Sequence, residues 1–227
     1  MNRDLIVEVS LPTLVLSLVI LVFSVLFLYK RLFVLRKARS STIDITGVVQ
    51  SGKTALFYKL TENENPETVS SITQNSAEVN LFDGKYRLID FPGHARLRPE
   101  LLGQLRKSSP GVVVVVVDGM ERASVKETGE LMFELMTIEN LGSPMVIAVS
   151  KSDLDNYRSP GVVAAEIERE IDAVRKSREA EGVYLGVYGE NFKLSKHCPF
   201  EIRLCGFSSK GEMKGLLAAI GKSVNCK

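Results

Sequence analysis

The sequence predicts an α/β fold in which a mostly parallel sheet carries helices on both faces, preceded by one N-terminal transmembrane helix. Strand-like and helical segments alternate from residue 42 onward, the pattern of a parallel sheet with crossover helices. Two segments, 111–118 and 144–150, are continuous apolar runs typical of strands buried on both faces. An Asp-Gly pair at 83–84, between two alternating segments, predicts one antiparallel hairpin.

The membrane prediction rests on residues 9–29, which contain no charged side chain. A helix needs about 20 apolar residues to cross the hydrocarbon core. A buried core helix is usually shorter and amphipathic, and a cleaved signal peptide has a shorter apolar region followed by a small-residue cleavage site. Neither alternative fits this segment, so we expect a membrane-spanning helix.

The charge distribution orients this helix. Residues 1–39 hold six Lys and Arg residues against two acidic ones, a net charge of +4, whereas the whole chain is at +2 and the remainder therefore at −2. Most of these basic residues follow the apolar segment, and the positive side of a membrane helix stays cytoplasmic. We expect a short lumenal N-terminus at 1–8, a basic cytosolic linker at 30–41 and a cytosolic domain at 42–227. Direct nucleic-acid binding is not expected, because the domain carries no excess positive charge.

The cysteines and histidines limit the metal chemistry of the chain. Cys198, Cys205 and Cys226 have a spacing that fits no zinc motif, so free thiols in a reducing compartment are expected. The chain has two histidines, and a multi-histidine metal site is therefore excluded.

The elements of the domain follow from apolar periodicity and turn residues. Strands are predicted at 42–46, 77–82, 85–90, 111–118, 144–150 and 200–209. Helices are predicted at 53–61, 97–105, 124–141, 161–182 and 211–224. We interpret the many charges of the 161–182 helix as a solvated face. Residues 183–199 are expected to form an irregular surface loop over the sheet edge, without an assigned function.

The sequence GVVQSGKT matches the phosphate-binding pattern G-x-x-x-x-G-K-[ST]. Lys53 would reach the outer phosphates, and the Thr54 hydroxyl would ligate Mg²⁺. A plain strand-to-helix turn is the alternative. A strand before the motif and a helix after it favour phosphate binding, since the helix N-terminus then faces the anion. The residues expected around the phosphates are Gly47, Val48, Val49, Gln50, Ser51, Gly52, Lys53 and Thr54.

A second motif, DFPGH, follows the second strand of the hairpin. Asp90 ends that strand and can hold Mg²⁺ through a water molecule, while the N–H of Gly93 can contact a γ-phosphate. This D-x-x-G arrangement is that of switch loops in GTPases. An ordinary Pro-Gly turn is the competing interpretation.

Two further motifs point to guanine. In SKSD, the carboxylate of Asp153 can accept the two hydrogen bonds that guanine N1 and N2 donate, and the stem of Lys151 can lie against the purine. Ser150 stands where Asn or Thr is usual. In SSK, at 208–210, the N–H of Ser209 would contact guanine O6. Adenine lacks the donor pair that Asp153 would accept.

Together these four motifs resemble the Ras-like GTPases, which are P-loop NTPases, nearest to the Arf/Sar branch. The apolar N-terminal segment, SSIT at 70–73 and DFPGHARLRPEL at 90–101 make the chain similar to the family of signal recognition particle receptor β-subunits. The resemblance covers nearly the whole chain. It implies a GTP-binding domain at 42–227, with GTP and Mg²⁺ as its ligands.

The resemblance also assigns switch and catalytic roles. The first switch would comprise Ser70, Ser71, Ile72 and Thr73, with the Thr73 hydroxyl on Mg²⁺. His94 stands where Ras carries its water-positioning Gln. It is a candidate catalytic residue and equally a side chain that packs against a partner.

The phosphate loop affects the expected rate of hydrolysis. The branched Val49 occupies a position that is often Gly in Ras-type loops, and it could crowd the γ-phosphate. Hydrolysis is therefore expected to be slow or stimulated by a partner.

The resemblance implies a single-pass protein of the endoplasmic reticulum membrane with a cytosolic GTP-binding domain. Its GTP form would bind the receptor α-subunit. Through that subunit it would be linked to signal recognition particle and the ribosome. The translocon is a further candidate partner. Three alternatives remain open from the sequence: an Arf/Sar-like GTPase that cycles in membrane traffic, a scaffold that binds little nucleotide, and a P-loop ATPase. Asp153 speaks against the last.

Overall fold

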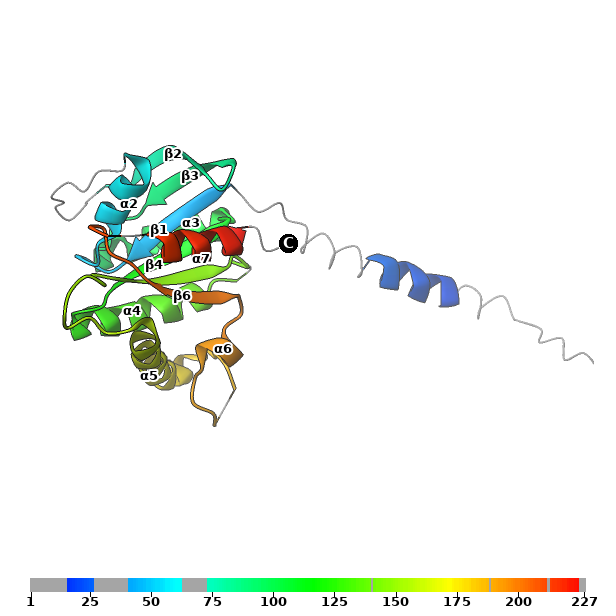
Figure 1. Cartoon of the computed structure of the whole chain (residues 1–227). Coiled ribbons are helices and arrows are strands. Elements are labelled where there is room, and N and C mark those ends of the chain that lie inside the picture. The colour runs from blue at the N-terminus through cyan, green and yellow to red at the C-terminus, as the bar shows by residue number, and fades with distance from the viewer. Residues whose placement is uncertain are drawn as a thin grey trace, which may run out of the picture. The chain divides into compact units, whose positions relative to one another are not determined.

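The computed structural model describes residues 16–26, 41–62, 73–139, 141–187, 189–211 and 213–224 (Figure 1). The chain divides into two units, 1–38 and 39–227. In the first unit, residues 16–26 form a helix inside the predicted 9–29 segment. The rest of that segment, the predicted 1–8 terminus and the linker up to residue 40 lie outside the described residues. Within the described ranges, no helix combines the length and the apolar character needed to cross a bilayer.

The second unit is built on a six-stranded sheet with the order β2-β3-β1-β4-β5-β6 (Figure 1). Its strands are β1 Thr42–Gly47, β2 Asn75–Leu81, β3 Gly84–Asp90, β4 Val112–Asp118, β5 Met145–Ser150 and β6 Ile202–Gly206. β2 is antiparallel to β3, and every other pair in the sheet is parallel. The prediction of a mostly parallel sheet with one antiparallel hairpin is confirmed.

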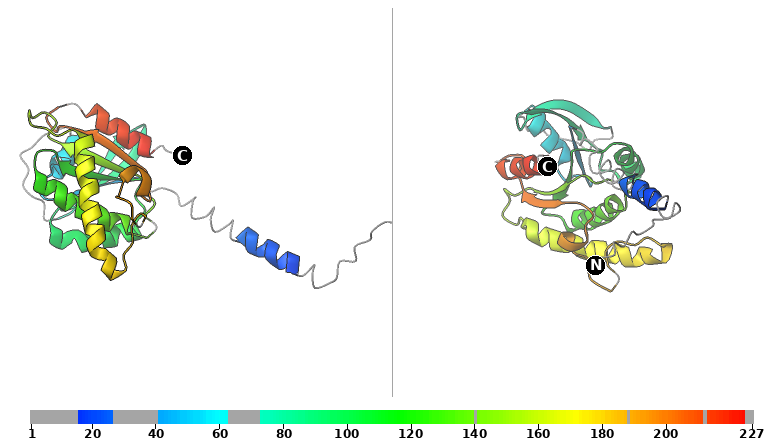
Figure 2. Two further views of the ribbon diagram at one scale, coloured as in Figure 1. Left: turned by 90° about the horizontal axis from the view of Figure 1, so that it is seen from below. Right: turned by 90° about the vertical axis from the view of Figure 1, so that its right-hand side faces the viewer.

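Helices cover both faces of this sheet (Figure 2). They are α2 Lys53–Thr61, α3 Arg98–Lys107, α4 Arg122–Met136, α5 Pro160–Arg178, α6 Leu194–His197 and α7 Lys214–Val224, with short 3-10 turns at Ala95–Leu97 and Glu179–Glu181. One core lies under α2 and α7, and the other under α3, α4 and α5. The valine run of β4 serves both cores, since alternate valines face opposite sides. This is why the run shows no polar alternation.

Several predicted boundaries were too generous. The last strand covers 202–206 and not 200–209, and the helix predicted at 124–141 ends at Met136. The hydroxyl of Thr137 there donates to the carbonyl of Glu134, at 2.8 Å, and so competes for the backbone at the helix end. The last helix begins at Lys214 and not at residue 211.

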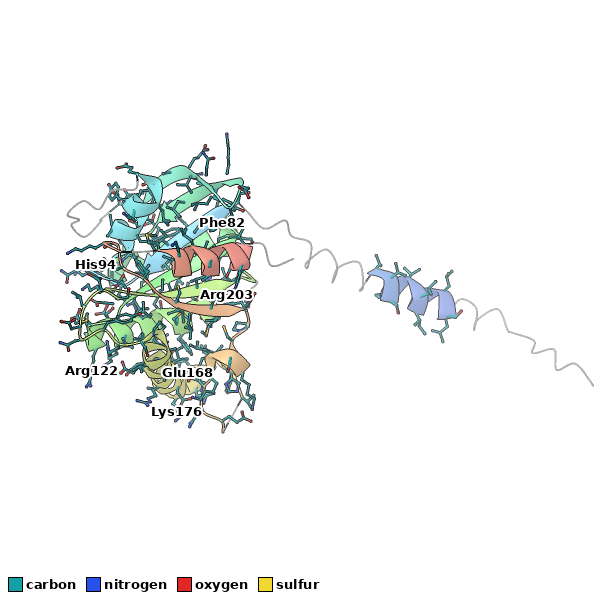
Figure 3. All side chains as sticks on the ribbon, viewed as in Figure 1. Phe82, His94, Arg122, Glu168, Lys176 and Arg203 are labelled. Atoms are coloured by element: carbon teal, nitrogen blue, oxygen red, sulfur yellow. The ribbon has the colours of Figure 1, made fainter. Side chains whose placement is uncertain are left out.

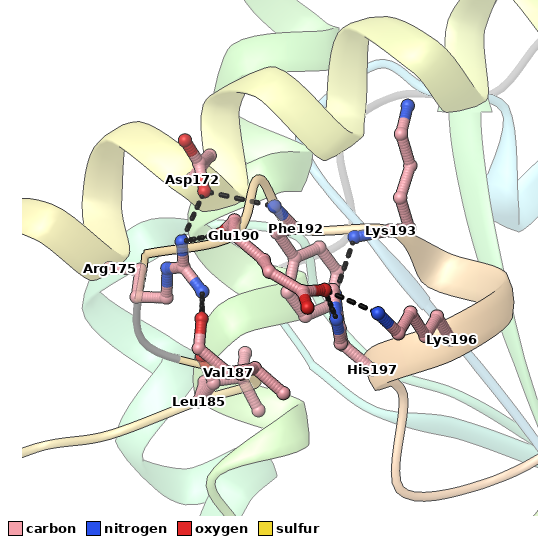
Figure 4. Close-up of polar contacts among 9 residues, drawn as sticks. All are labelled: Asp172, Arg175, Leu185, Val187, Glu190, Phe192, Lys193, Lys196 and His197. Carbon is pink, nitrogen blue, oxygen red and sulfur yellow. Dashed lines mark hydrogen bonds and ion pairs between the residues drawn. The ribbon is translucent and has the colours of Figure 1, made fainter.

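The interpretation of the 161–182 helix as a merely solvated face was wrong in part. Arg175 and Asp172 of α5 are buried, and Arg175 donates hydrogen bonds to Asp172 and to the carbonyls of Leu185 and Val187 (Figure 4). It also donates to the carbonyl of Glu190. The segment after α5 is thus built onto that helix and does more than cover an edge.

Two further features bind this segment to the domain. Its Phe192 is 1% exposed and belongs to the core under α5. Its residues 194–197 form the short helix α6, where an irregular loop was predicted. The segment is therefore part of the folded domain.

Candidate guanine-nucleotide site

The carboxyl ends of the parallel strands place the four predicted motifs at one edge of the sheet. Gly47 ends β1, Asp90 ends β3 and Ser150 ends β5, while Ser208 follows β6 closely. Ligands of open α/β sheets bind outside this edge. His94 lies on the opposite side of the domain from Phe82 and Arg203, which belong to the other end of the strands (Figure 3).

The phosphate loop has the backbone that its glycines predict. Gly47 has φ 144° and Gly52, the residue before α2, has φ 94°. A Cβ atom at Gly47 would lie 2.2 Å from the carbonyl oxygen of Val116, so no side chain fits there. Gln50 also has a positive φ, of 60°. The loop therefore curls tightly between β1 and α2, which turns main-chain N–H groups toward its inside.

Lys53 points into this curl. Its Nζ donates to the carbonyl of Val48 at 2.6 Å, and the residue is buried. Burial lowers the pKa of Lys53 to about 8, although the nearby Asp90 carboxylate opposes the shift. A buried ammonium held inside the loop is well placed to attract a phosphate.

Asp90 forms the centre of the predicted magnesium position. Its Oδ2 accepts hydrogen bonds from the Thr54 hydroxyl at 3.0 Å and from the Asn75 side-chain amide at 3.3 Å. Burial raises the pKa of Asp90, opposed by these two hydrogen bonds and by the charge of Lys53. Its Oδ1 is buried and has no hydrogen-bond partner among the described residues. The Thr54 hydroxyl and the Asp90 carboxylate, one oxygen of which is unused, are donors that fit Mg²⁺.

Sequence reasoning missed Asn75. It pairs with Asp90 in the register of the hairpin, so its side chain reaches the same carboxylate. The hairpin was predicted, but its register was not, and only the register places Asn75 at the site. The signal that could have found it is a polar residue at the start of β2.

The two described switch residues, Gly93 and Thr73, have different surroundings. A Cβ atom at Gly93 would lie 2.5 Å from Nζ of Lys53 and 2.7 Å from the carbonyl carbon of Val48, so Gly93 packs directly on the loop. Thr73 is exposed and helps to line a pocket of about 210 Å³ together with Phe91 and residues of α3. Ser70, Ser71 and Ile72 lie outside the described residues.

His94 has a local structural contact. Its Nδ1 accepts a hydrogen bond from the N–H of Arg96 at 3.3 Å, so His94 caps the 3-10 turn Ala95–Leu97. The side chain is exposed. A catalytic role for His94 stays a prediction.

The guanine motifs meet through several contacts between loops. The N–H of Ser152 donates to the carbonyl of Phe207 at 3.2 Å. A hydrogen bond from the Ser208 side chain, together with the charge of Lys210, lowers the pKa of Asp153. The Ser208 hydroxyl also accepts from the N–H of Lys210 at 3.1 Å. The SKSD and SSK loops are thus held together, and Ser209 lies in the second of them.

Lys151 is fixed from the neighbouring strand. It has φ 64°, and its ammonium pairs with the buried carboxylate of Asp118, which ends β4. Sequence reasoning missed both Asp118 and Ser208. An acidic residue that ends a run of buried valines was the available signal for the first. For Ser208 there was none beyond its place in the motif.

Ser150, the unusual residue of the guanine motif, should tolerate replacement by Ala. Its hydroxyl is buried, lies 3.7 Å from where a Cβ atom at Gly52 would sit, and has no partner among the described residues. Removing a hydroxyl that makes no hydrogen bond costs little, so we expect Ser150→Ala to change the free energy of unfolding by less than about 1 kcal/mol. Urea unfolding measures this. A loss above about 2 kcal/mol would reveal a hydrogen bond that this geometry lacks.

The sheet order and the loops at its carboxyl edge define a Ras-like GTPase fold. The family model described as "Signal recognition particle receptor beta subunit" matches residues 38–196, which is more than half of the chain. The chain belongs to this family.

Three relatives illustrate the relationship. Signal recognition particle receptor subunit beta of Mus musculus is 31% identical over 193 residues, which cover 78% of this chain and 71% of that protein. The structure of the mammalian SRP receptor matches with a TM-score of 0.72 and 30% identity over 80% of this chain and 98% of the other. The SRb-GTP/SRX complex from Chaetomium thermophilum matches with a TM-score of 0.64 at 21% identity, covering 80% and 97% of the two chains, and shows the shared fold.

Proposed function

We propose that the chain is a GTP-dependent switch that holds the receptor α-subunit at the endoplasmic reticulum membrane. Residues 9–29 would anchor it as a single membrane-spanning helix, with 1–8 in the lumen. Residues 30–41 would be a basic cytosolic linker and 42–227 the cytosolic GTP-binding domain. The family supports this function, and the related SRb-GTP/SRX complex from Chaetomium thermophilum supports the link between nucleotide and partner.

The observation that carries the proposal is the buried carboxylate of Asp90 between Thr54 and Lys53. It accepts a 3.0 Å hydrogen bond from the Thr54 hydroxyl, which brings together two predicted magnesium ligands, one from the start of α2 and one from the end of β3. Lys53 is buried beside it and stays inside the phosphate loop. The other oxygen of this carboxylate, Oδ1, is buried without a hydrogen-bond partner among the described residues, which costs stability unless a ligand uses it.

The proposed roles of the residues follow from their places. Residues 47–54 would wrap the phosphates with main-chain N–H groups, and Lys53 would neutralise their charge. Thr54 and Thr73 would ligate Mg²⁺ directly, and Asp90 would do so through water. The bound ion would screen the charge between the phosphates. Lys151, Asp153 and Ser209 would read the guanine base.

The switch would act through Gly93 and Thr73. Gly93 already packs against the phosphate loop, so its N–H can respond to a third phosphate with little movement. Thr73 lies at the pocket beside Phe91 and α3, on the same side of the domain. Ordering these two residues by GTP would shape one continuous surface for the α-subunit. Signal recognition particle and the ribosome would be reached through that subunit, and the translocon is a further candidate.

The Arf/Sar-like alternative, a GTPase that cycles in membrane traffic, differs in its dependence on turnover. Such an enzyme needs a residue that positions the attacking water, and His94 is the candidate. His94 instead caps a 3-10 turn with its Nδ1. Steady turnover that is lost in His94→Ala would favour the cycling enzyme.

The test exchanges the base that the site reads. Xanthine carries a carbonyl where guanine carries its N2 amino group, so an amide at position 153 can donate where the carboxylate accepted. We expect the full chain, purified in mild detergent, to prefer GTP over XTP, and Asp153→Asn to reverse this preference by at least about 100-fold. Equilibrium competition against a fluorescent nucleotide measures it, and Asp155→Asn, a nearby exposed change, should leave it unaltered.

The parent chain and Asp153→Asn also test the switch. The α-subunit should bind the parent chain with GTP but not with GDP or XTP, and Asp153→Asn with XTP but not with GTP. Equal binding of the α-subunit in every nucleotide state would refute the switch and favour a scaffold. Binding of ATP in place of GTP would refute the guanine site itself.

A further inference from the structure

We propose that Tyr157 is a positioning residue for guanine recognition, seated in a slot between Gly119 and Gly206 that only glycines leave open. The inference rests on the proposed function, because it concerns how the loop with Lys151 and Asp153 is held. Tyr157 lies in the connection between β5 and α5 and packs on the core under α5.

The slot is defined by what side chains at its walls would meet. A Cβ atom at Gly119, just after β4, would lie 2.9 Å from two ring carbons of Tyr157. A Cβ atom at Gly206, at the end of β6, would lie 2.2 Å from the Tyr157 hydroxyl. Both distances are shorter than any normal contact. The ring therefore spans from the end of β4 to the end of β6, across Val149 of β5.

Backbone geometry does not explain these two glycines. Neither Gly119 nor Gly206 has a positive φ, the conformation for which glycine is usually required. The close approach of the tyrosine ring excludes a side chain at both positions, and at Gly119 the Cγ1 methyl group of Val149 is equally close, at 2.9 Å. Tyr157 is the contact that the two glycines share.

The tyrosine fixes the far end of the guanine loop. Its N–H donates to the carbonyl of Leu154 at 3.0 Å, and the next residue, Arg158, donates through Nε to the carbonyl of Gly119 at 2.8 Å. The near end is fixed by the ion pair of Lys151 with Asp118. Asp153 lies between these two attachments.

This arrangement matters because Asp153 has little packing of its own. It is exposed, and its attachment is to Ser208 in the loop after β6. Base recognition by two hydrogen bonds requires placement within about 0.5 Å. The Tyr157 ring ties the Asp153 loop to β6, and so sets the distance between the carboxylate and the loop that contains Ser209.

The hydroxyl of Tyr157 supplies a sharp test, because it is buried and has no hydrogen-bond partner among the described residues. Removing this hydroxyl should therefore cost little stability. It is also the atom that a methyl group at position 206 would clash with. We therefore expect Tyr157→Phe to keep GDP dissociation within about twofold of the parent, and Gly206→Ala to accelerate it by about tenfold or more. The double variant should regain most of the loss, since the nearest remaining ring atom lies 3.3 Å away.

The experiment uses the full chain in detergent and measures the dissociation rate of fluorescent GDP. It also measures the ratio of the affinities for GDP and IDP. The base of IDP lacks the amino group from which Asp153 would accept a hydrogen bond. In Gly206→Ala this ratio should fall toward one and recover in the double variant. A general loss of stability would weaken both nucleotides alike. Tyr157→Leu, which leaves the slot partly empty, should also lower the ratio if Gly206→Ala does not fold.

The outcomes separate the inference from the proposed function. If the parent prefers GDP over IDP and neither Gly206→Ala nor Tyr157→Leu changes that preference, the positioning role is refuted while the guanine site stands. A ratio that falls without recovery in the double variant also refutes it. If the parent shows no preference for GDP, the proposed function fails and the inference with it.

Discussion

Replacing Arg175 with Met should lower the free energy of unfolding by about 3–5 kcal/mol, the cost of breaking a buried ion pair from one side. The Arg175 side chain is 5% exposed and lies 2.7 Å from Asp172. It donates to three main-chain carbonyls of the segment after α5, which lose their charged donor in the variant. Urea unfolding should show the loss, and hydrogen exchange should show reduced protection in residues 183–193.

Lys176→Met is the matched control for this prediction. Lys176 also pairs with Asp172, at 2.8 Å, but its side chain is 63% exposed. Exposed ion pairs contribute at most about 1 kcal/mol, so the control should cost no more than that. Equal losses in Arg175→Met and Lys176→Met would show that the carbonyl contacts contribute nothing and that only the charge beside Asp172 matters.

The pair with Asp172 also predicts a pH dependence. Burial opposes ionisation of Asp172, but hydrogen bonds from Lys176 and from the N–H of Phe192, with the charges of Arg175 and Lys176, outweigh it and lower its pKa. A lowered pKa in the folded state means that this stabilisation is present above the ordinary pKa of 3.8 and is lost as the pH falls through the folded value. The gap between the parent and Arg175→Met should therefore narrow in acid.

Asp44→Asn should stabilise the domain at pH 8, by an amount on the order of 4 kcal/mol. Asp44 is 2% exposed in the middle of β1, and its Oδ1 has no hydrogen-bond partner among the described residues. Burial raises the pKa of Asp44 from 3.8 to about 7, although the charge of Arg87 opposes the shift. At pH 8 the folded parent must keep this carboxylate charged in an apolar setting.

The sign of this effect can be checked against pH. A carboxyl group with a raised pKa binds more protons in the folded state than in the unfolded state between pH 3.8 and about 7. The contribution of Asp44 is therefore fully present below pH 3.8 and is lost as the pH rises through 7. Asn cannot titrate, so the advantage of the variant should vanish near pH 4. Urea unfolding at pH 4, 6 and 8 measures it.

Asp83→Asn is the control for Asp44→Asn. Asp83 is exposed in the hairpin turn with φ 62°, a conformation that Asn accepts as readily as Asp. This change should alter stability by less than about 0.5 kcal/mol at each pH. If Asp44→Asn gave no gain at pH 8, the carboxylate would have to reach solvent or a cation in solution.

The sheet and the placement of the four loops could be predicted because each has a local signal. Apolar runs predict buried strands, Asp83-Gly84 predicts the hairpin, and the carboxyl ends of parallel strands share an edge. The contacts that depend on register could not be predicted. Asn75 reaches Asp90 only because β2 pairs with β3 in one register, and Tyr157 meets Gly119 and Gly206 only once β4, β5 and β6 are aligned.

Buried charged residues were the other feature that the sequence did not predict. Apolar periodicity identifies what is inside, but it cannot say that Asp44 or Arg175 is inside too, because charged residues count as surface in such patterns. Arg175 is buried because the segment after α5 folds back, so that carbonyls 10, 12 and 15 residues further along the chain accept its hydrogen bonds. The spacing of residues within α5 does not predict that the following segment folds back onto this helix. The roles of the individual site residues stay predictions until ligand binding is measured.

The point where the chain enters the domain has a consequence for how the molecule can work. The carbonyl of Ser41 accepts from the N–H of Arg87, at 2.8 Å, so the polypeptide joins the sheet where β1 begins, beside the middle of β3. The loops that we assign to nucleotide and partner stand where those strands finish. Within the described domain, the entry of the chain and the loops assigned to the nucleotide thus lie at opposite ends of β1, so a change at one end must pass along the whole strand to reach the other.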